Sequence, residues 1–165
     1  MSYIHRCASP VGELTLASDG RALTGLWFDG QRHFGSTLSG DAEEAELEIF
    51  AQTERWLSAY FSGREPDFLP PLRFIGSAFS VTVWELLLGI PYGRTLSYGE
   101  LARRAAERTG RAACARAVGS AVGRNPISIV VPCHRVIRAG GSPGGYAAGT
   151  EIKKRLLALE HSGGA

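Results

Sequence analysis

The segment Asn125–Ile137, NPISIVVPCHRVI, holds the residue pair best suited to nucleophilic chemistry. Its apolar residues predict an extended strand between two prolines, and Cys133 follows the second proline. His134 comes next, and a histidine near a thiol can lower the thiol pKa from about 8.5 and so raise the fraction of reactive thiolate. The pair alone is a weak indication, because most buried cysteines are inert and adjacent side chains on a strand point to opposite faces.

Two predicted helices precede this segment. Ser97 and Glu100 match a capping box and predict a helix over residues 98–108, and a second helix is predicted over residues 112–123. Two short helices joined by a Gly-containing turn suggest a helix-turn-helix, but the small side chains of the second helix would also suit a close-packed internal pair. Arginines around the pair favour nucleic-acid binding. They are Arg103, Arg104, Arg108, Arg111, Arg116 and Arg124.

Charge is distributed unevenly along the chain. The formal net charge is +2, but residues 1–96 carry 7 Lys and Arg against 12 Asp and Glu, whereas residues 97–165 carry 11 against 4. This asymmetry suggests a polyanionic partner, with a solvated arginine-rich face as the alternative. The second helix has few long polar side chains that could reach base edges in a major groove. It therefore suits the DNA minor groove, where close backbone approach and phosphate contacts matter more.

The N-terminal part is rich in strand-forming residues. Asp41 is expected to open a helix whose hydrophobic residues continue to a stop at Gly63 and cover a sheet. The sheet itself is predicted as an antiparallel meander of three short strands. The strands are expected at residues 3–8, 13–17 and 22–28.

A proline-rich stretch at residues 64–72 separates this part from helix-dominated sequence. It predicts an N-terminal domain over residues 1–72 and a C-terminal domain over residues 73–165. Ser77 and Thr150 are expected to open the first and last helices of the second domain. The predicted fold class is α+β, with a small N-terminal α/β domain containing an antiparallel sheet and a mostly helical C-terminal domain containing the helix-turn-helix.

The last helix carries a carboxylate of interest. Ile152, Leu156 and Leu159 predict a buried stripe, which places Glu160 near the edge of that stripe and within reach of a neighbouring imidazole. The alternative is a surface carboxylate near a helix C-terminus, where the helix dipole disfavours negative charge.

Composition narrows the class of protein. With 44% hydrophobic and 21% charged residues the chain is expected to be globular. Its start, MSYIHRCASP, lacks the features of a signal peptide, and no apolar run approaches the roughly 20 residues that span a bilayer. A cytoplasmic protein with no membrane role is therefore expected. Three cysteines form no C-x-x-C pair, and His5, Cys7 and His33 are poorly spaced for zinc, so no metal site is expected.

Three short strings together carry a family resemblance. Pro132–Val136 (PCHRV), preceded by Ala115–Gly119 (ARAVG) and by Asn125-Pro126, closely resembles the O6-alkylguanine-DNA alkyltransferases, also called methylated-DNA–protein-cysteine methyltransferases. The resemblance extends from about Phe79 to Glu160. The N-terminal region is similar to the smaller, variable domain of that family.

The resemblance implies direct-reversal repair of double-stranded DNA. An alkyl group would move from O6 of guanine to Cys133, irreversibly and once per molecule, after minor-groove binding and base flipping. His134 would draw the thiol proton through a bound water, Glu160 would orient the imidazole, and Tyr98 would donate a hydrogen bond to the leaving guanine. A thiolate suits displacement at carbon, and the reaction needs no cofactor.

Further roles follow from the same resemblance. Arg116 would enter the base stack in place of the flipped nucleotide, and Asn125 would tie the recognition helix to the active-site segment. The other expected DNA-contacting residues are Ala117, Gly119, Ser120 and Arg124. The expected substrate-pocket residues are Val136, whose backbone with that of Cys133 would read the guanine amino group, Tyr146, Ala147 and Ser128.

The sequence departs from the family pattern at the pocket. Ala147 stands where many members have a serine, and Ser128 where some have a proline that packs against bulky substituents. The segment 106–111 between the two helices is also longer than expected. The preferred alkyl group, activity on O4-alkylthymine and inhibitor sensitivity therefore stay open.

Three other functions are alternatives to alkyl transfer. A cysteine hydrolase would need the thiol at a helix N-terminus or a G-x-C-x-G elbow, and it would turn over. A non-catalytic sensor of alkylated DNA would not need Cys133. Gene regulation would need a further DNA-binding domain. A monomer is expected, with cooperative binding along DNA left open.

Overall fold

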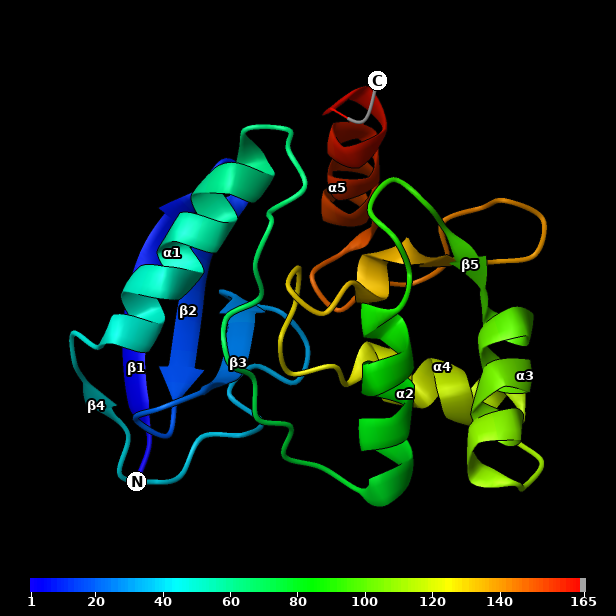
Figure 1. Ribbon diagram of the computed structural model, residues 1–165, viewed down its shortest axis with the longest axis horizontal. Helices are drawn as coiled ribbons and strands as arrows, with labels where there is room; N and C mark the ends of the chain where they lie inside the picture. The colour runs from blue at the N-terminus through cyan, green and yellow to red at the C-terminus, as the bar shows by residue number, and fades with distance from the viewer. Residues whose placement is uncertain (164–165) are drawn as a thin grey trace.

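The computed structural model describes residues 1–163 and places a strand layer and a helical layer side by side (Figure 1). The predicted meander is confirmed: an antiparallel sheet joins neighbouring strands in the order β3-β2-β1, and β4 is added in parallel at the β1 edge. The strands are β1 (Tyr3–Ser9), β2 (Gly12–Ser18), β3 (Leu23–Phe28) and β4 (Glu43–Glu44).

Helix α1 (Glu48–Phe61) contacts the three long strands and buries Phe50, Trp56 and Tyr60. The prediction that Asp41 opens this helix is wrong, because α1 begins seven residues later. The backbone of the preceding acidic stretch pairs with β1 instead: Glu43 N–H donates to Ser2 O at 3.0 Å. Edge pairing therefore takes the backbone donors that a longer helix would have used.

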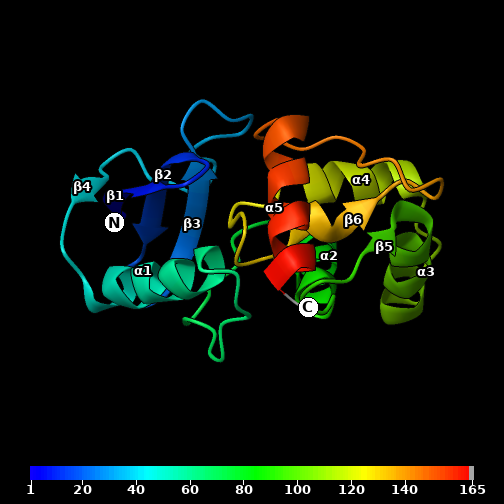
Figure 2. The same cartoon turned by 90° about the horizontal axis from the view of Figure 1, so that it is seen from above.

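The C-terminal part contains α2 (Ala78–Leu88), α3 (Tyr98–Thr109), α4 (Ala115–Gly123) and α5 (Thr150–Gly163). Helices α2, α3 and α4 pack against one another, and the fold is α+β with a helical C-terminal part, as predicted (Figure 2). Ser77 and Ser97 cap α2 and α3 as expected, each hydroxyl accepting a backbone N–H three residues on at 3.1 Å. Glu100 does not complete the capping box, because its carboxylate pairs with Arg103.

The start of α4 differs from the prediction. The helix begins at Ala115, three residues later than expected, and Cys114 is its N-cap, with Sγ accepting the N–H of Ala117 at 3.4 Å. Gly110 ends α3 in the left-handed region at φ 71°. The longer connection noted in the sequence therefore forms a turn and an extended approach to α4.

The apolar run before Cys133 is not the predicted strand. It folds into tight turns, in which Ile129 has a φ of 69° and the N–H of Val131 donates to Ile127 O at 3.0 Å. Only one end pairs with a strand: Ser128 N–H donates to Leu26 O of β3 at 2.9 Å. An apolar run buried on every side cannot be assigned to strand or turn by periodicity, and its backbone is satisfied here by neighbours.

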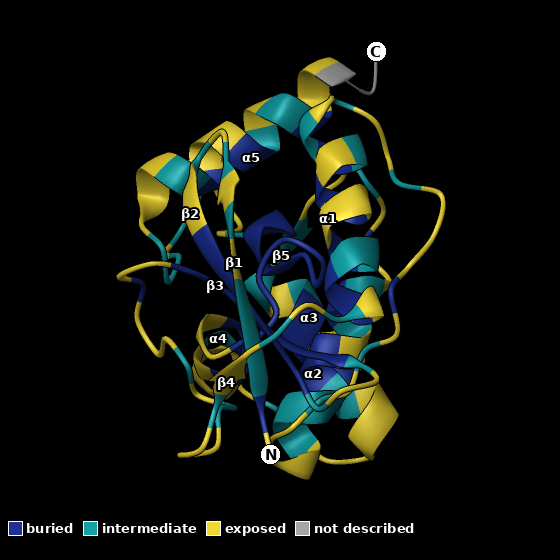
Figure 3. Cartoon of the chain, turned by 90° about the vertical axis from the view of Figure 1, so that its left-hand side faces the viewer, coloured by how far each residue is buried: buried dark blue, intermediate teal, exposed yellow. Residues whose placement is uncertain are grey.

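Cys133 then opens a short 3₁₀ helix, η1 (Cys133–Arg135), followed by β6 (Val136–Ile137), which pairs in parallel with β5 (Leu96–Ser97). The apolar residues of both layers form one hydrophobic cluster. The buried positions of the chain are dark blue in Figure 3. Within residues 1–163, no helix has the length and apolar character needed to cross a membrane.

Candidate active site

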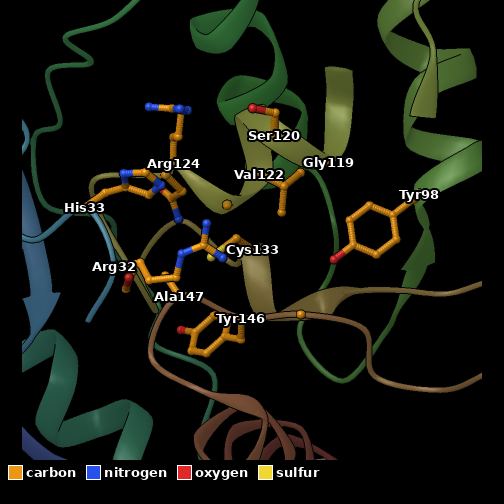
Figure 4. Close-up of a pocket in the computed structure, with 14 residues that line it drawn as sticks. Arg32, His33, Tyr98, Gly119, Ser120, Val122, Arg124, Cys133, Tyr146 and Ala147 are labelled. Carbon is orange, nitrogen blue, oxygen red and sulfur yellow. The ribbon is translucent and has the colours of Figure 1, made fainter. Parts of the chain in front are cut away.

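Cys133 lies at a cavity of about 300 Å³ between α4, the turns before η1 and the loop that leads to α5 (Figure 4). Its side chain is buried, with 6% of the residue exposed. Most of the residues predicted at the site line the same cavity. They are Tyr98, Gly119, Ser120, Arg124, Asn125, Ser128, Tyr146 and Ala147.

The other predicted residues lie around this cavity. His134, Val136 and Glu160 are fully buried or nearly so behind it. Arg116 and Ala117 are exposed on α4, whose opposite face buries Val118. The structure thus brings the predicted nucleophile Cys133, the predicted relay residues His134 and Glu160, and helix α4 into one region of the fold.

A buried carboxylate organises the residues behind Cys133. Glu160 Oε2 lies 2.5 Å from His134 Nε2, and Glu160 Oε1 accepts from Arg135 Nε at 2.8 Å and from the N–H of Gly93 at 3.1 Å. Burial alone would raise the pKa of this carboxyl, but the hydrogen bonds and charges of His134 and Arg135 outweigh burial and lower the pKa to about 2. Glu160 is therefore a carboxylate at neutral pH.

This carboxylate fixes the proton on His134. A carboxylate only accepts hydrogen bonds, so Nε2 of the imidazole carries the hydrogen that Glu160 binds. Burial lowers the pKa of His134, against the raising effect of Glu160, which favours the neutral ring. Nδ1 has no hydrogen-bond partner among the described residues. A neutral imidazole with an unprotonated Nδ1 can accept a proton.

The Cys133 thiol is held mainly in its protonated form. Burial raises its pKa, and the hydrogen bond from Asn125 and the charge of Lys153 oppose that rise. Lys153 is itself buried, donating from Nζ to Val136 O at 2.6 Å and to Gly145 O at 3.1 Å, and burial lowers its pKa to about 8. Chemistry at Cys133 therefore requires removal of its proton at the moment of reaction.

Asn125 joins α4 to the turns before Cys133. Its Nδ2 donates to Val131 O at 2.9 Å and to Ile127 O at 3.3 Å, and its Oδ1 accepts the Ile127 N–H at 3.0 Å. Each buried group left unpaired costs about 1–3 kcal/mol. This side chain therefore stabilises the turns that form where a strand was expected.

Tyr98 forms one wall of the cavity at the start of α3 (Figure 4). A Cβ on Gly144 would lie 3.3 Å from the Tyr98 hydroxyl, and Gly144 has a φ of 75°. Glycine at this position therefore leaves room for the tyrosine and permits the backbone conformation. Tyr146 packs edge-on against Phe28 of β3 on another side of the cavity.

Several residues that contribute to the site were not predicted from the sequence. Arg32 and His33, in the loop after β3, line the cavity, and Arg32 N–H donates to Ala147 O at 3.1 Å. Tyr60 and Arg135 both bind Glu160. No local pattern marks Arg32, His33 or Tyr60, because the tertiary fold alone brings them to the site.

His5, Cys7 and His33, the residues with poor zinc spacing in the sequence, do not come together in the structure. His5 Nε2 pairs with Glu54 Oε1 at 2.6 Å, whereas His33 lies at the cavity. Among residues 1–163 there is no group of three His, Cys, Asp or Glu side chains arranged to hold a metal ion.

Comparisons with known proteins agree with this arrangement. Residues 2–74 and 78–162 match the ribonuclease-like and DNA-binding domains of 6-O-methylguanine DNA methyltransferase. A methylated-DNA–protein-cysteine methyltransferase of Mycobacterium leprae is 45% identical over 160 residues, 97% of this chain and 93% of the relative. One of Methanosarcina acetivorans is 43% identical over 155 residues, 93% of this chain and 95% of the relative.

Solved structures show the same relationship. The structure of Mycobacterium tuberculosis OGT in complex with DNA has a TM-score of 0.84 and 42% identity, covering 98% of this chain and 94% of that one. An O6-methylguanine DNA methyltransferase of Methanococcus jannaschii has a TM-score of 0.63 and 26% identity, covering 95% and 93%. These matches confirm the resemblance seen in the sequence: the chain belongs to the 6-O-methylguanine DNA methyltransferase family.

Proposed function

We propose that this chain repairs alkylated DNA by moving an alkyl group from O6 of guanine to Sγ of Cys133, once per molecule. The observation that carries the proposal is the buried thiol at a cavity, directly followed by an imidazole that a buried carboxylate holds with Nδ1 free. Relatives that match nearly the whole chain are named for transfer of a methyl group from DNA to a protein cysteine.

The proposed reaction is a displacement at carbon. The Cys133 proton passes through a water molecule to Nδ1 of His134, and the thiolate attacks the alkyl carbon. The new S–C bond forms as the C–O6 bond breaks, and its electron pair stays on the guanine, which takes up a proton. Tyr98 donates a hydrogen bond to the guanine ring as negative charge develops there. The thioether cannot easily release its alkyl group, so one transfer inactivates the protein. The reaction needs no cofactor.

The cavity requires the base to leave the duplex. Cys133 is 6% exposed, so a guanine inside the DNA stack could not reach its sulfur. Extrusion costs a few kcal/mol, and less for a lesion that pairs poorly, which contributes selectivity. We propose that backbone groups of Cys133 and Val136 read the flipped base, while Ser128, Tyr146 and Ala147 surround its substituent.

We propose that α3 and α4 act as a helix-turn-helix on the minor groove. The outer face of α4 exposes the small residues Ala117 and Ser120, and Ser120 also lines the cavity. Small side chains let the backbone approach phosphates closely. Gly119 and Arg124 complete the contact surface, and Arg116 fills the gap left by the flipped nucleotide. Asn125 transmits the position of this helix to the segment that bears Cys133.

The proposed organisation is a monomer with domains at residues 1–72 and 73–165. A single chain supplies every group of the proposed reaction, which supports action as a monomer. The three cysteines are free, and a thiol nucleophile must stay reduced, which suits the cytoplasm.

The proposed function is tested by its stoichiometry. Duplex DNA containing O6-methylguanine, given in excess, should be repaired up to a plateau of one lesion per protein molecule. The reason is that the thioether cannot release its methyl group. Continued repair beyond that plateau would contradict suicide transfer and favour a hydrolytic enzyme. Binding of the lesion with no repair at all would favour the non-catalytic sensor.

Arg116→Ala tests the role of the exposed helix. Repair of duplex DNA should slow by about ten-fold, equivalent to about 1.4 kcal/mol of the base-extrusion cost. Reaction with the free base O6-methylguanine should be nearly unchanged, because nothing has to be opened. The measurement is the single-turnover rate on both substrates, with Arg108→Ala as a control that removes another exposed arginine. Equal losses on both substrates would contradict the intercalating role.

A further inference from the structure

Tyr60 connects helix α1 of the N-terminal part to His134 and Glu160, which lie behind Cys133. It lies near the end of α1, and its hydroxyl donates to Glu160 Oε2 at 2.7 Å and lies 3.4 Å from His134 Nε2. The side chain is fully buried. These contacts bridge 100 and 74 residues of sequence, so only the tertiary fold creates them.

We propose that Tyr60 is a positioning residue for alkyl transfer: its hydroxyl holds the Glu160 carboxylate against Nε2 of His134 and thereby keeps Nδ1 free to receive the Cys133 proton. The inference rests on the proposed function and deepens it. It gives α1, which belongs to the ribonuclease-like part of the chain, a direct share in the chemistry.

The direction of the hydrogen bonds follows from the groups involved. Burial, and next the charge of Glu160, raises the pKa of Tyr60, so the phenol keeps its proton. Glu160 can only accept, so the single phenol hydrogen points to Oε2. The phenol oxygen then presents a lone pair toward Nε2 of His134. Both the carboxylate and the phenol oxygen therefore favour a hydrogen on Nε2 and an unprotonated Nδ1.

Tyr60 is well fixed for this role. Its ring stacks on Trp56 with centroids 5.4 Å apart and meets His134 edge-on at 6.3 Å. Packing on two sides fixes the ring, so little conformational freedom is lost when the hydroxyl binds. The hydroxyl therefore meets Glu160 in one orientation.

The other groups around His134 and Glu160 do not duplicate the hydrogen bond from the Tyr60 hydroxyl to Glu160. Arg135 of η1 binds both oxygens of Glu160, through Nε to Oε1 and through Nη2 to Oε2 at 3.2 Å. Without Tyr60, Oε2 would lose its phenol donor and keep the bonds from His134 and Arg135, and the carboxylate could turn toward the guanidinium. The remaining titratable groups near His134 and Tyr60 are Lys153 of α5, Cys133, and Tyr92 and Tyr146 from loops.

The test compares two tyrosines whose rings meet edge-on. Tyr60→Phe removes the bonded hydroxyl and keeps the ring. Tyr92→Phe removes a buried hydroxyl that has no hydrogen-bond partner among the described residues, on a ring 6.2 Å from that of Tyr60. Tyr60→Phe should slow single-turnover methyl transfer from duplex DNA by about ten-fold, as for loss of an outer partner that orients a histidine. Tyr92→Phe should stay within about two-fold of the wild type.

The pH profile separates positioning from packing. In Tyr60→Phe the rate profile should shift to higher pH, as in Glu160→Gln but by less, because the protonated imidazole is less well stabilised. In the Glu160→Gln background, Tyr60→Phe should cost less than about two-fold, because it acts through that carboxylate. DNA affinity, measured separately, should match the wild type in each variant.

Other results would overturn the inference. A full ten-fold loss in both backgrounds with an unshifted pH profile would assign Tyr60 to packing alone. An unchanged rate in Tyr60→Phe would remove it from the relay while leaving the transfer itself intact. Failure of the wild type to transfer methyl groups would instead overturn the proposed function.

Discussion

Glu160→Gln should slow single-turnover alkyl transfer by roughly 100-fold, at the upper end for partners that orient a histidine, because it removes charge as well as geometry. The carboxylate stabilises the imidazolium that forms when His134 takes the Cys133 proton. A neutral amide stabilises it less, so the thiolate is harder to generate and the rate profile moves to higher pH. The variant also leaves the Arg135 guanidinium facing an uncharged partner in a buried position.

The measurement is the transfer rate against pH for the wild type and Glu160→Gln, with DNA binding followed separately. Glu151→Gln is the matched control, because Glu151 lies in the first turn of the same helix with its side chain 88% exposed. Binding should be nearly equal in all three proteins. An unchanged rate and profile in Glu160→Gln would exclude Glu160 from the mechanism.

The same carboxylate should give the stability of the chain a defined pH dependence. The pKa of Glu160 is about 2 in the folded chain against an ordinary 4.5, so its ionised form stabilises the fold. That contribution is complete above about 4.5 and is lost as the pH falls toward 2. The difference in unfolding free energy between the wild type and Glu160→Gln should therefore shrink across this interval.

Local sequence patterns were sufficient to predict the elements whose structure is determined by residues close together in the sequence. The meander was predicted from strand-forming residues between turns, and the starts of α2 and α3 from the capping residues Ser77 and Ser97. The string around Cys133 and His134 indicated a segment that lies at a cavity, and most of the predicted residues line that cavity.

Sequence patterns did not predict the burial of residues whose hydrogen-bond partners come from distant segments of the chain. The predicted stripe on α5 used Ile152, Leu156 and Leu159, but the most buried positions are Lys153, Leu156 and Glu160. Hydrophobic periodicity assumes an apolar interior, whereas this face binds backbone carbonyls, an imidazole and a guanidinium. Glu160 is therefore at the centre of the buried face and not at its edge.

The turns before Cys133 were not predicted for the same reason, because their backbone hydrogen-bond partners are not apparent from the local hydrophobic pattern. Asn125 and the edge of β3 supply hydrogen bonds to the backbone of this apolar run. The prediction had assumed that a strand pairing would supply them. Arg32 and Tyr60 reach the site from the N-terminal layer, and nothing adjacent to them in sequence indicates a partner more than 90 residues away.

Cys133→Ala should abolish alkyl transfer and leave binding to DNA intact. Cys7 and Cys114 do not line the cavity at which Cys133 lies. Burial, and next the charges of Glu54 and Glu13, raises the pKa of Cys7 to about 11, and Cys114 is used as the N-cap of α4. Repair is measured by loss of O6-methylguanine from duplex DNA, with Cys114→Ala as the control that should still repair. Residual transfer in Cys133→Ala would place the acceptor elsewhere.

The most direct test of this account is mass spectrometry of the wild-type protein after one exposure to duplex DNA containing O6-methylguanine. The intact chain should gain one methyl group, and peptide mapping should place it on Sγ of Cys133. A methyl group on Cys7 or Cys114, or disappearance of the lesion with no methyl group on the protein, would contradict the account.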